Sequence, residues 1–492
     1  MWYGVSSIAA RFINYLLTPY LTLKFSNSGF GEISLLYSAI PFLNVIFTYG
    51  METAYFRFYN TRSDKNAVYN TASLSLLVST VLLTTILVLF RWPLASTLRM
   101  GEHVGYFTIA ALIIGFDALA SIPFARLRQE NRPRKYAIVR VGGILVNIAA
   151  TYFFISICPG LLASHPQSAW LAWYDPAWAV GYVFVANLIQ SVFTLALLSK
   201  ELLGFSWKFD KVLWKEMMVY SLPLIIAGFG GMINETFDRI MLGWLAPVAT
   251  EEAAKGQVGI YSACYKLSIL ITLAVQAFRM GAEPFFFKQA ADSNAGKTYA
   301  RVMKFFVITL CGMFLFVVLF MNEWKHFIQN KSMWVGLGVV PILLLANMFL
   351  GIYYNLSIWY KLGNRTMAGA YITVAGAAIT LLINGIFIRY YSYMACAWAT
   401  FFCYGSMMVM SYLWGQKVYP VPYAWKKLIA YIVIALLVYG VQVLISQFIQ
   451  NQWVITFAGM FLLAAYGLFV AKVERKELMN LPVVGRWVQK WL

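Results

Sequence analysis

The sequence has few charged residues and almost none of the residues that metal or thiol chemistry needs. Asp, Glu, Lys and Arg make up only 12% of the 492 residues, whereas 61% are hydrophobic, and this balance excludes a water-soluble fold. The three histidines are scattered (His103, His165 and His326), and the five cysteines include no CxxC pair. Because metal sites need ligands at short characteristic spacings, we expect neither a metal centre nor catalytic thiol chemistry.

The sequence has instead a long series of apolar runs, each about as long as one bilayer crossing. The first set of predicted spans lies near residues 2–23, 31–54, 70–90, 104–123, 136–157, 178–199 and 217–246. The second set lies near 258–282, 299–321, 334–356, 366–388, 393–415, 427–448 and 453–473. The prediction is therefore an all-α polytopic membrane protein with about 14 transmembrane helices.

Membrane topology explains the excess of basic residues. There are 38 Lys and Arg against 19 Asp and Glu, a formal net charge of +19. When the loops are numbered from the first, about 24 of the basic residues fall in the even loops and the C-terminal tail, and about 7 in the odd loops. Basic loops stay in the cytoplasm, so both termini are predicted to be cytoplasmic. No soluble basic face is present, so no nucleic-acid partner is expected.

The longest predicted outer loop runs from Cys158 to Ala177. It has no Lys or Arg but carries Trp170, Trp173 and Tyr174. Aromatic residues of this kind collect at the membrane surface, so the loop is predicted to anchor there.

An internal repeat links the two halves of the chain. Three pairs of motifs match at nearly constant offsets of about 228 to 236 positions. The matches are the GxxSxxY pattern from Gly31 and from Gly259, Gly50 and Glu52 with Gly281 and Glu283, and Gly115 and Ser121 with Gly351 and Ser357. Chance can produce one such match, but three at one offset indicate a duplication of about six helices.

The duplication predicts how the chain is divided. An even number of helices per copy gives two parallel lobes, related by a pseudo-two-fold axis along the membrane normal. The predicted parts are an N-terminal lobe of helices 1–6 (residues 1–205), a C-terminal lobe of helices 7–12 (206–415), and helices 13 and 14 with a cytoplasmic tail (416–492). Parallel lobes commonly enclose a transport site and work by alternating access. The alternative is a duplication retained only for folding.

Polar stripes on the predicted helices mark faces that turn to protein or water, because a lipid-facing surface needs no polar residue. They occur on the first, second, seventh and eighth helices, which hold matching positions in the two lobes. We expect these stripes to face each other across one cavity. Its predicted polar lining is Asn14, Thr18, Tyr37, Asn44, Asn234, Tyr265 and Gln276.

Basic residues also lie within the predicted spans. An unpaired Arg or Lys in mid-bilayer costs about 2.5–3.5 kcal/mol on insertion, so it needs a partner or a wet cavity. We expect a cationic lining that holds an anionic headgroup. The alternatives are structural pairing, as between Glu235 and Arg239, and snorkelling of Arg57 and Arg140 to the surface. The predicted substrate-binding set is Arg11, Arg57, Arg140, Arg239, Lys266 and Arg279.

Carboxylates in the same zone are predicted to couple transport to an ion, H+ or Na+, or to act as counter-ions of the arginines. These are Glu52, Asp117, Glu235, Asp238 and Glu283. Asp117 is the best coupling residue of the set, because no basic residue lies on its own helical face. No other cofactor is expected.

Several stretches resemble the bacterial polysaccharide transporter family of the multidrug, oligosaccharidyl-lipid and polysaccharide exporter superfamily. They are RFINYLLTPYLTLKFSNSGFGEISLLYSAIPFLNVIFTYGMETAYFRFY, LPLIIAGFGGMINETFDRIMLGW, VGIYSACYKLS, EPFFFK, GIYYNLSIWYKLGNRT and LLINGIFI. The resemblance covers residues 1–415 continuously. It rests on the order and spacing of the stretches rather than on one motif.

The resemblance implies a non-enzymatic flippase of the bacterial inner membrane. Its substrate would be an undecaprenyl-pyrophosphate-linked oligosaccharide, moved to the outer leaflet for lipopolysaccharide O-antigen, capsule or exopolysaccharide synthesis. Membrane lipids and other polysaccharide-assembly proteins are the partners that it implies. Pyrophosphate would bind the arginines, and sugars would bind the polar stripes.

Three alternatives stay open at this point. A multidrug or cation antiporter shares the superfamily, but a cationic cavity should repel its substrates. A flippase for the peptidoglycan lipid precursor shares the fold and is poorly separated by sequence. A membrane-embedded glycan polymerase or ligase should need an outer loop with acid, base or phosphate-holding groups, and the outer loop here has no Lys or Arg.

Overall fold

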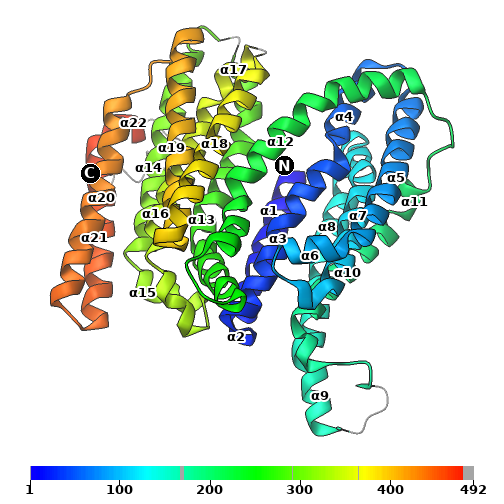
Figure 1. Cartoon of the computed structure of the whole chain (residues 1–492). Helices are drawn as coiled ribbons and strands as arrows, with labels where there is room; N and C mark the ends of the chain where they lie inside the picture. Colours follow the sequence, from blue (N-terminus) through cyan, green and yellow to red (C-terminus); the bar gives the residue numbers. More distant parts are fainter. Residues whose placement is uncertain (1, 167–170, 291, 364, 480–492) are drawn as a thin grey trace. The chain divides into compact units, whose positions relative to one another are not determined.

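A computed structural model describes residues 2–166, 171–290, 292–363 and 365–479, and its regular structure in these ranges is helical (Figure 1). In this part of the chain, 13 helices are long and apolar enough to cross a membrane. The chain is a multi-pass membrane protein, and the predicted all-α polytopic fold is confirmed. Trp170 and residues 480–492 of the predicted tail lie outside the described residues.

The helices of the first part of the chain are α1 (Trp2–Tyr15), α2 (Leu17–Lys24), α3 (Asn27–Thr48), α4 (Met51–Thr61), α5 (Lys65–Leu89), α6 (Arg91–Thr97), η1 (Gly101–His103), α7 (Val104–Gln129), α8 (Pro133–Tyr152), the π-helical η2 (Phe153–Ile157), α9 (Cys158–Ser164), η4 (Pro176–Trp178), α10 (Ala179–Leu197) and α11 (Ser199–Leu202).

The second part contains α12 (Lys211–Leu245), α13 (Glu251–Gln289), α14 (Ala295–Val318), α15 (Met321–Trp324), η5 (Lys325–Phe327), η6 (Lys331–Gly336), α16 (Val339–Leu356), α17 (Ile358–Leu362), α18 (Thr366–Tyr391), α19 (Tyr393–Val418), α20 (Trp425–Phe448), α21 (Gln452–Val473) and α22 (Arg475–Leu478).

These helices form two compact units. Unit 1 contains the described residues up to Ala263, together with Asn330–Gly336 and Gly369–Cys403. Unit 2 contains Cys264–Gln329, Leu337–Ala368 and the described residues from Tyr404 onward. The predicted copies of the repeat are called repeat 1 (residues 1–205) and repeat 2 (206–415) below, and their bounds stay a prediction.

The first predicted span is divided in the structure. It forms α1, of 14 residues, and α2, of 8 residues, with Leu16 between them. Pro19 has no amide hydrogen to donate to the carbonyl of Tyr15, one turn earlier, and this lost bond weakens the helix at that point. Neither piece alone is long enough to be counted among the 13 candidate spans.

The second predicted span is divided as well. Helix α3 continues through Pro41 and ends at Thr48, after which Tyr49 (φ 33°) and Gly50 (φ 72°) adopt the left-handed conformation before α4 begins. Glycine reaches this conformation without steric cost, so Gly50 marks the natural position of the break.

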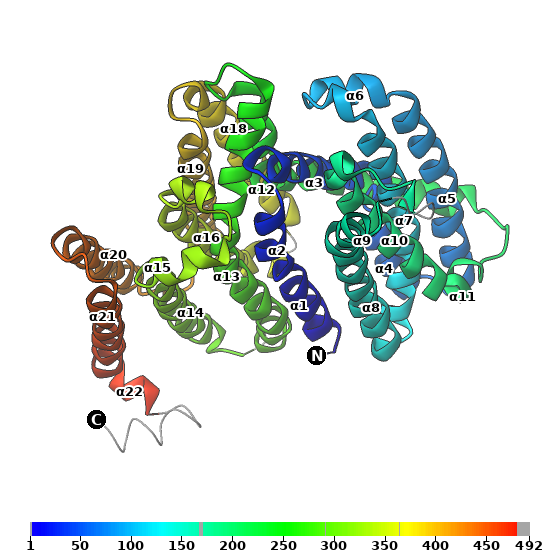
Figure 2. The ribbon, with the colours of Figure 1, turned by 90° about the horizontal axis from the view of Figure 1, so that it is seen from below.

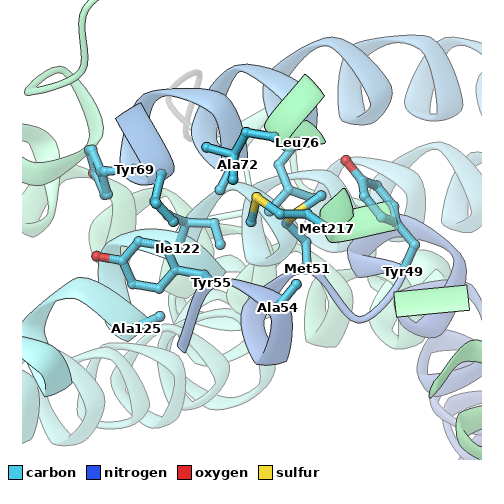
Figure 3. Close-up of a cluster of buried hydrophobic side chains, with 12 residues drawn as sticks. Tyr49, Met51, Ala54, Tyr55, Tyr69, Ala72, Leu76, Ile122, Ala125 and Met217 are labelled. Atoms are coloured by element: carbon cyan, nitrogen blue, oxygen red, sulfur yellow. The ribbon is translucent and has the colours of Figure 1, made fainter. Parts of the chain in front are cut away.

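A buried cluster anchors this break in unit 1 (Figure 3). Met51, Ala54 and Tyr55 of α4 are fully buried, and they pack against α5, α7 and α12. The cluster consists of Tyr49, Met51, Ala54, Tyr55, Val68, Tyr69, Ala72, Leu76, Ile122, Ala125, Leu213 and Met217. The direction of α4 is therefore set by tertiary packing rather than by continuation of α3.

Equivalent glycines make equivalent contacts in the two units. A Cβ on Gly115 of α7 would lie 2.7 Å from the Thr84 hydroxyl of α5, in unit 1. A Cβ on Gly351 of α16 would lie 2.7 Å from Val275 of α13 and 3.2 Å from Leu310 of α14, in unit 2. In each case the fourth helix of the copy lies close to the third, as a structural duplication requires.

Helices α20 and α21 pack against α14 in unit 2 (Figure 2). Glu474, just after α21, is only 3% exposed and receives hydrogen bonds from Lys304 of α14 (2.6 Å) and Tyr431 of α20 (2.6 Å). Burial by itself would raise the pKa of this carboxyl, but the bonds from Lys304, Tyr431 and Lys427 hold the pKa below its ordinary value. A buried ion pair thus ties the last two long helices to α14.

Candidate functional site

Within unit 1, α3 crosses the first part of α13 at two glycines that occupy the same place in the repeat. A Cβ on Gly31 would lie 1.8 Å from the Lys255 carbonyl oxygen, and a Cβ on Gly259 would lie 2.0 Å from the Asn27 carbonyl oxygen. Lys255 stands one turn before Gly259, and Asn27 stands one turn before Gly31. The glycine of each copy therefore lies against the backbone carbonyl one turn before the glycine of the other copy. Such a reciprocal contact is what a two-fold axis requires.

Polar groups surround this glycine crossing. The Lys255 ammonium donates to Glu32 (2.8 Å), and the imidazole of His103 lies 3.9 Å from the same carboxylate. The side-chain oxygen of Asn27 accepts a hydrogen bond from Ser332 (2.7 Å). The sequence predicts that this end of α3 faces the outer side. We call the glycine pair with its Glu32–Lys255 bond the outer crossing.

A second group of polar side chains lies within the helices of repeat 1. The side chain of Asp117 of α7 is exposed and accepts a hydrogen bond from Ser191 of α10 (2.9 Å). Arg140 of α8 and Tyr37 of α3 both lie within electrostatic reach of the Asp117 carboxylate. The Tyr37 hydroxyl accepts a hydrogen bond from Asn187 of α10 (3.2 Å). The structure thus brings three predicted residues together and adds two that the sequence analysis missed.

A third group is buried in unit 1. Asp238 and Arg239 of α12 are 3% and 9% exposed, and the Arg239 guanidinium lies 3.0 Å from the Asp238 carboxylate. Tyr261 donates a hydrogen bond to the other Asp238 oxygen (2.6 Å). Asn234 donates to the backbone carbonyl of Thr373 (3.1 Å). The sequence analysis offered Glu235 as the acid that pairs with Arg239, whereas the carboxylate beside Arg239 in the structure is that of Asp238.

At the predicted inner end, both copies of the repeat contain the same ion pair. Glu52 of α4 pairs with Arg128 at the end of α7, in unit 1. Glu283 of α13 pairs with Lys361 of α17 (2.5 Å), in unit 2. The acids are repeat-equivalent, and Arg128 and Lys361 occupy matching positions three residues before the Asn131 and Asn364 of the repeat. Helices two and four of each copy are therefore bridged in the same way.

In unit 2 this bridge has an additional member. Arg279 of α13 donates from Nε to Glu283 (2.8 Å), and its guanidinium lies 4.6 Å from the centre of the Tyr354 ring. In unit 1, Arg57 and Arg140 instead lie over aromatic rings, 4.3 Å from those of Tyr220 and Phe124 respectively. An aromatic face of this kind holds a guanidinium in place while leaving its N–H groups open.

The remaining predicted residues differ in exposure. Arg11, Asn14 and Asn44 are exposed, Lys266 is half-buried, and Thr18 is buried. Glu235 is exposed, with its backbone carbonyl accepting from Arg239 (2.8 Å), and Tyr265 and Gln276 are half-buried. Residues up to Glu235 in this set belong to unit 1, whereas Tyr265, Lys266 and Gln276 belong to unit 2. A shared cavity for all of them stays a prediction.

The predicted outer loop packs its aromatic residues together. The rings of Tyr174 and Tyr182 stack at 4.7 Å, and the Tyr174 hydroxyl donates to the Phe154 carbonyl (2.8 Å). Burial raises the pKa of Tyr174 to about 12. Trp173 remains 53% exposed. An aromatic surface is thus present in the described part of the loop, as anchoring to a membrane would need.

Comparison with known proteins identifies the family. The model of the family described as polysaccharide biosynthesis protein matches residues 1–289. Two proteins of Haemophilus influenzae are similar, an "Uncharacterized membrane protein" (21% identical over 300 residues, 59% of this chain and 65% of that protein) and "Lsg locus putative protein 1" (20% over 293 residues, 58% and 64%). The chain covers slightly less than two thirds of either relative.

Solved structures show the same fold. The inward closed conformation of the lipid II flippase MurJ has a TM-score of 0.72 at 14% identity, and the match covers 97% of this chain and 99% of that one. An inward-facing multidrug resistance transporter of the MATE family, from the MOP superfamily, has a TM-score of 0.65 at 13% identity, covering 83% and 94%. The chain belongs to the polysaccharide biosynthesis protein family and has a MurJ- and MATE-like fold, as the sequence resemblance predicted.

Proposed function

We propose that this member of the polysaccharide biosynthesis protein family is a flippase for undecaprenyl-pyrophosphate-linked oligosaccharides. It moves them from the cytoplasmic to the outer leaflet of the bacterial inner membrane by alternating access, with both termini in the cytoplasm. The observation that carries the proposal is the outer crossing. Two repeat-equivalent glycines meet there in a symmetric backbone contact, which is a suitable place for two copies of one bundle to close and reopen.

The charge of the helices favours an anionic substrate. Arg11 and Arg140 are exposed on helices of unit 1, Lys266 is half-buried on α13, and an Arg or Lys within a membrane helix persists only with a partner or in contact with water. Guanidinium groups match phosphate oxygens in geometry, and the Asn and Tyr side chains of the stripes suit sugar hydroxyls. We propose the predicted cationic set as the headgroup-binding residues and the polar lining as sugar-binding residues.

Asp117 is proposed to couple transport to an ion. It is a carboxylate within a predicted span, its side chain is exposed, and the Ser191 hydroxyl donates a hydrogen bond to it. Glu52 and Glu283, by contrast, are engaged with basic partners and serve better as structural counter-ions. Asp238 is buried beside Arg239 and takes the same role.

The test is complementation of a strain whose own oligosaccharide flippase has been deleted. Expression of the chain should restore surface glycan, and Arg11→Ala or Lys266→Ala should lower the restored glycan by at least about tenfold with insertion unchanged, because a phosphate contact is worth more than 1.4 kcal/mol. Membrane abundance of each variant is the control. Normal glycan in both variants contradicts the binding assignment. A drug-resistance phenotype without glycan would favour the cation antiporter instead.

A further inference from the structure

Unit 2 contains a pocket at the predicted inner end of repeat 2, between α13, α16 and α17. The space within it, open mouth included, is about 290 Å³, of which only about 10 Å³ admits the centre of a water molecule. Its polar lining consists of Arg279, Glu283, Tyr354, Asn355, Ser357 and Lys361. We call it the repeat-2 pocket. The enclosed part therefore has room for about one water-sized group, such as a single phosphate oxygen, and not for a chain of sugars.

Asn355 is the feature that the fold does not explain. Its side chain is 3% exposed, and neither its amide nitrogen nor its amide oxygen has a hydrogen-bond partner among the described residues. A buried amide that lacks partners is costly, so such groups are normally paired with protein, water or a ligand. Since Asn355 lines the pocket, the pocket is where a partner would bind.

The first copy of the repeat shows which of these residues the fold itself requires. It has the equivalent bridge, between Glu52 and Arg128, so this bridge belongs to the shared architecture. The positions equivalent to Arg279, Tyr354 and Asn355 are occupied in repeat 1 by Thr48, Ala118 and Leu119. A copy of this bundle therefore folds without the three groups that turn the repeat-2 bridge into a pocket.

The charges of the pocket favour an anion. Arg279 and Lys361 carry two positive charges against the single negative charge of Glu283. The bond between Arg279 and Glu283 uses the Nε atom, so the two terminal nitrogens keep their N–H groups for a ligand. The Tyr354 ring, 4.6 Å from the guanidinium, keeps it in place. A planar guanidinium beside a free amide is an arrangement that binds phosphate oxygens through several hydrogen bonds.

We propose that the repeat-2 pocket binds a phosphate group, with the Arg279 terminal nitrogens and the Asn355 amide donating to its oxygens. Lys361 then shares its charge between Glu283 and the ligand, which weakens the bridge from α13 to α17 when phosphate is bound. This proposal rests on the proposed function where it takes the phosphate to be that of the lipid-linked substrate. The affinity of the pocket for phosphate stands apart from that function and is measured separately.

The experiment measures binding to the purified full-length chain in nanodiscs. One arm titrates inorganic pyrophosphate, and the other compares nanodiscs that contain polyprenyl monophosphate with nanodiscs that contain the neutral polyprenol. Arg279→Thr and Asn355→Leu install the residues of repeat 1 and should weaken phosphate binding at least tenfold in the arm that shows binding. Asn355→Asp keeps the size of the side chain and should weaken binding by repulsion.

The matched control is Arg128→Gln, which removes the equivalent bridge charge from repeat 1 and should leave phosphate affinity within twofold. The thermal unfolding temperature of each variant shows that it is folded. Binding in the lipid arm identifies a lipid phosphate as the ligand, and binding in the pyrophosphate arm alone identifies a soluble phosphate. Either result supports phosphate binding by the repeat-2 pocket. Unchanged affinity in folded Arg279→Thr and Asn355→Asp, or no binding by wild type in either arm, overturns it.

Failure of the pocket and failure of the proposed function give different results. Restored surface glycan in Arg279→Thr and Asn355→Leu, together with loss in Arg11→Ala, would leave the flippase standing without the pocket. Phosphate binding that depends on Asn355, in a chain that restores no glycan, would leave the pocket standing without the flippase.

Discussion

The two copies of the repeat share one bridge but break their helices at different places. In repeat 1, helix two is broken at Gly50 while helix four continues through α7 to Gln129. In repeat 2, helix two continues through the equivalent Gly281 to Gln289, while helix four is divided at Ser357 between α16 and α17. The Glu52–Arg128 and Glu283–Lys361 pairs nevertheless join the same two helices.

This difference shows which features serve folding and which are specialised. The bridge and the close glycine contacts of Gly115 and Gly351 occur in both copies, so they belong to the bundle itself. The Asp117 group occurs in repeat 1, and the pocket around Asn355 occurs in repeat 2. The two copies thus differ in their polar groups, with the Asp117 group in one and a pocket lined by Arg279 and Asn355 in the other.

The largest effect on transport is expected where the two copies touch. Gly31→Ala and Gly259→Ala each place a Cβ within 2.0 Å of a backbone carbonyl oxygen, so the outer crossing cannot close as it does now. For an overpacking cost of about 1–3 kcal/mol, we expect surface glycan to fall by about fivefold or more in both variants. Complementation of a flippase-deletion strain measures it.

The control for this pair is Gly256→Ala, one turn before Gly259, where the nearest atom to the new Cβ is 3.8 Å away. It should behave as wild type. If one glycine variant is inactive and the other fully active, the two glycines of the outer crossing are not equivalent in function, which contradicts the prediction.

An effect on stability rather than on transport is expected at the contact between α14 and the last two long helices. Lys304→Met removes the buried ammonium from Glu474, and breaking a buried pair costs about 3–5 kcal/mol. Lys427 pairs with the same carboxylate but is 54% exposed, so Lys427→Met should cost at most about 1 kcal/mol. Thermal unfolding in detergent compares the two. Equal losses would show that the Glu474 site is less buried than its contacts indicate.

The smallest effect concerns the buried carboxylate of repeat 1. Glu201, after α10, is 3% exposed and receives a bond from Lys135 (2.5 Å). Burial alone would raise the pKa of Glu201, but Lys135 and Arg132 hold that pKa below its ordinary value of 4.5. A lowered folded pKa means that the stabilisation is complete above pH 4.5 and is lost as the pH falls through the folded pKa.

Lys135→Met should therefore destabilise the protein by about 1 kcal/mol at pH 7, and the difference from wild type should shrink as the pH falls below the ordinary carboxyl range. Unfolding temperatures of both proteins, measured from pH 7 downward, check this. A difference that grows on acidification would contradict the sign of the shift. Glu474 in unit 2 should follow the same direction, since its pKa is lowered by the same kind of contact.

Most of the helical plan could be predicted from the sequence, because a membrane span is a local property of about 20 residues. The repeat could be predicted too, since Gly31 and Gly259 stand in matching motifs that need no coordinates to be compared. The breaks at Leu16 and Gly50 were missed. A hydropathy window averages over a break, and the position of α4 depends on the packing around Tyr55 and Met51.

The candidate site could be predicted only as a set of residue types. Arg279, Glu283 and Asp117 were predicted as charges inside the membrane. Their partners Lys361 and Ser191 lie on other helices, and no sequence pattern pointed to them. Asn355 could have been suspected by aligning the two copies, because Leu119 is the residue it replaces.

The sequence alone determined that this chain crosses the membrane many times, that its two halves carry matching motifs, and which charges lie within its helices, because hydropathy and motif spacing are local properties of the sequence. Only the tertiary structure decided that the glycines of the two copies meet, which acid pairs with which base, and that Asn355 is buried without a hydrogen-bond partner among the described residues. These depend on how helices from distant parts of the sequence pack, and packing is a property of surfaces brought together rather than of any single segment.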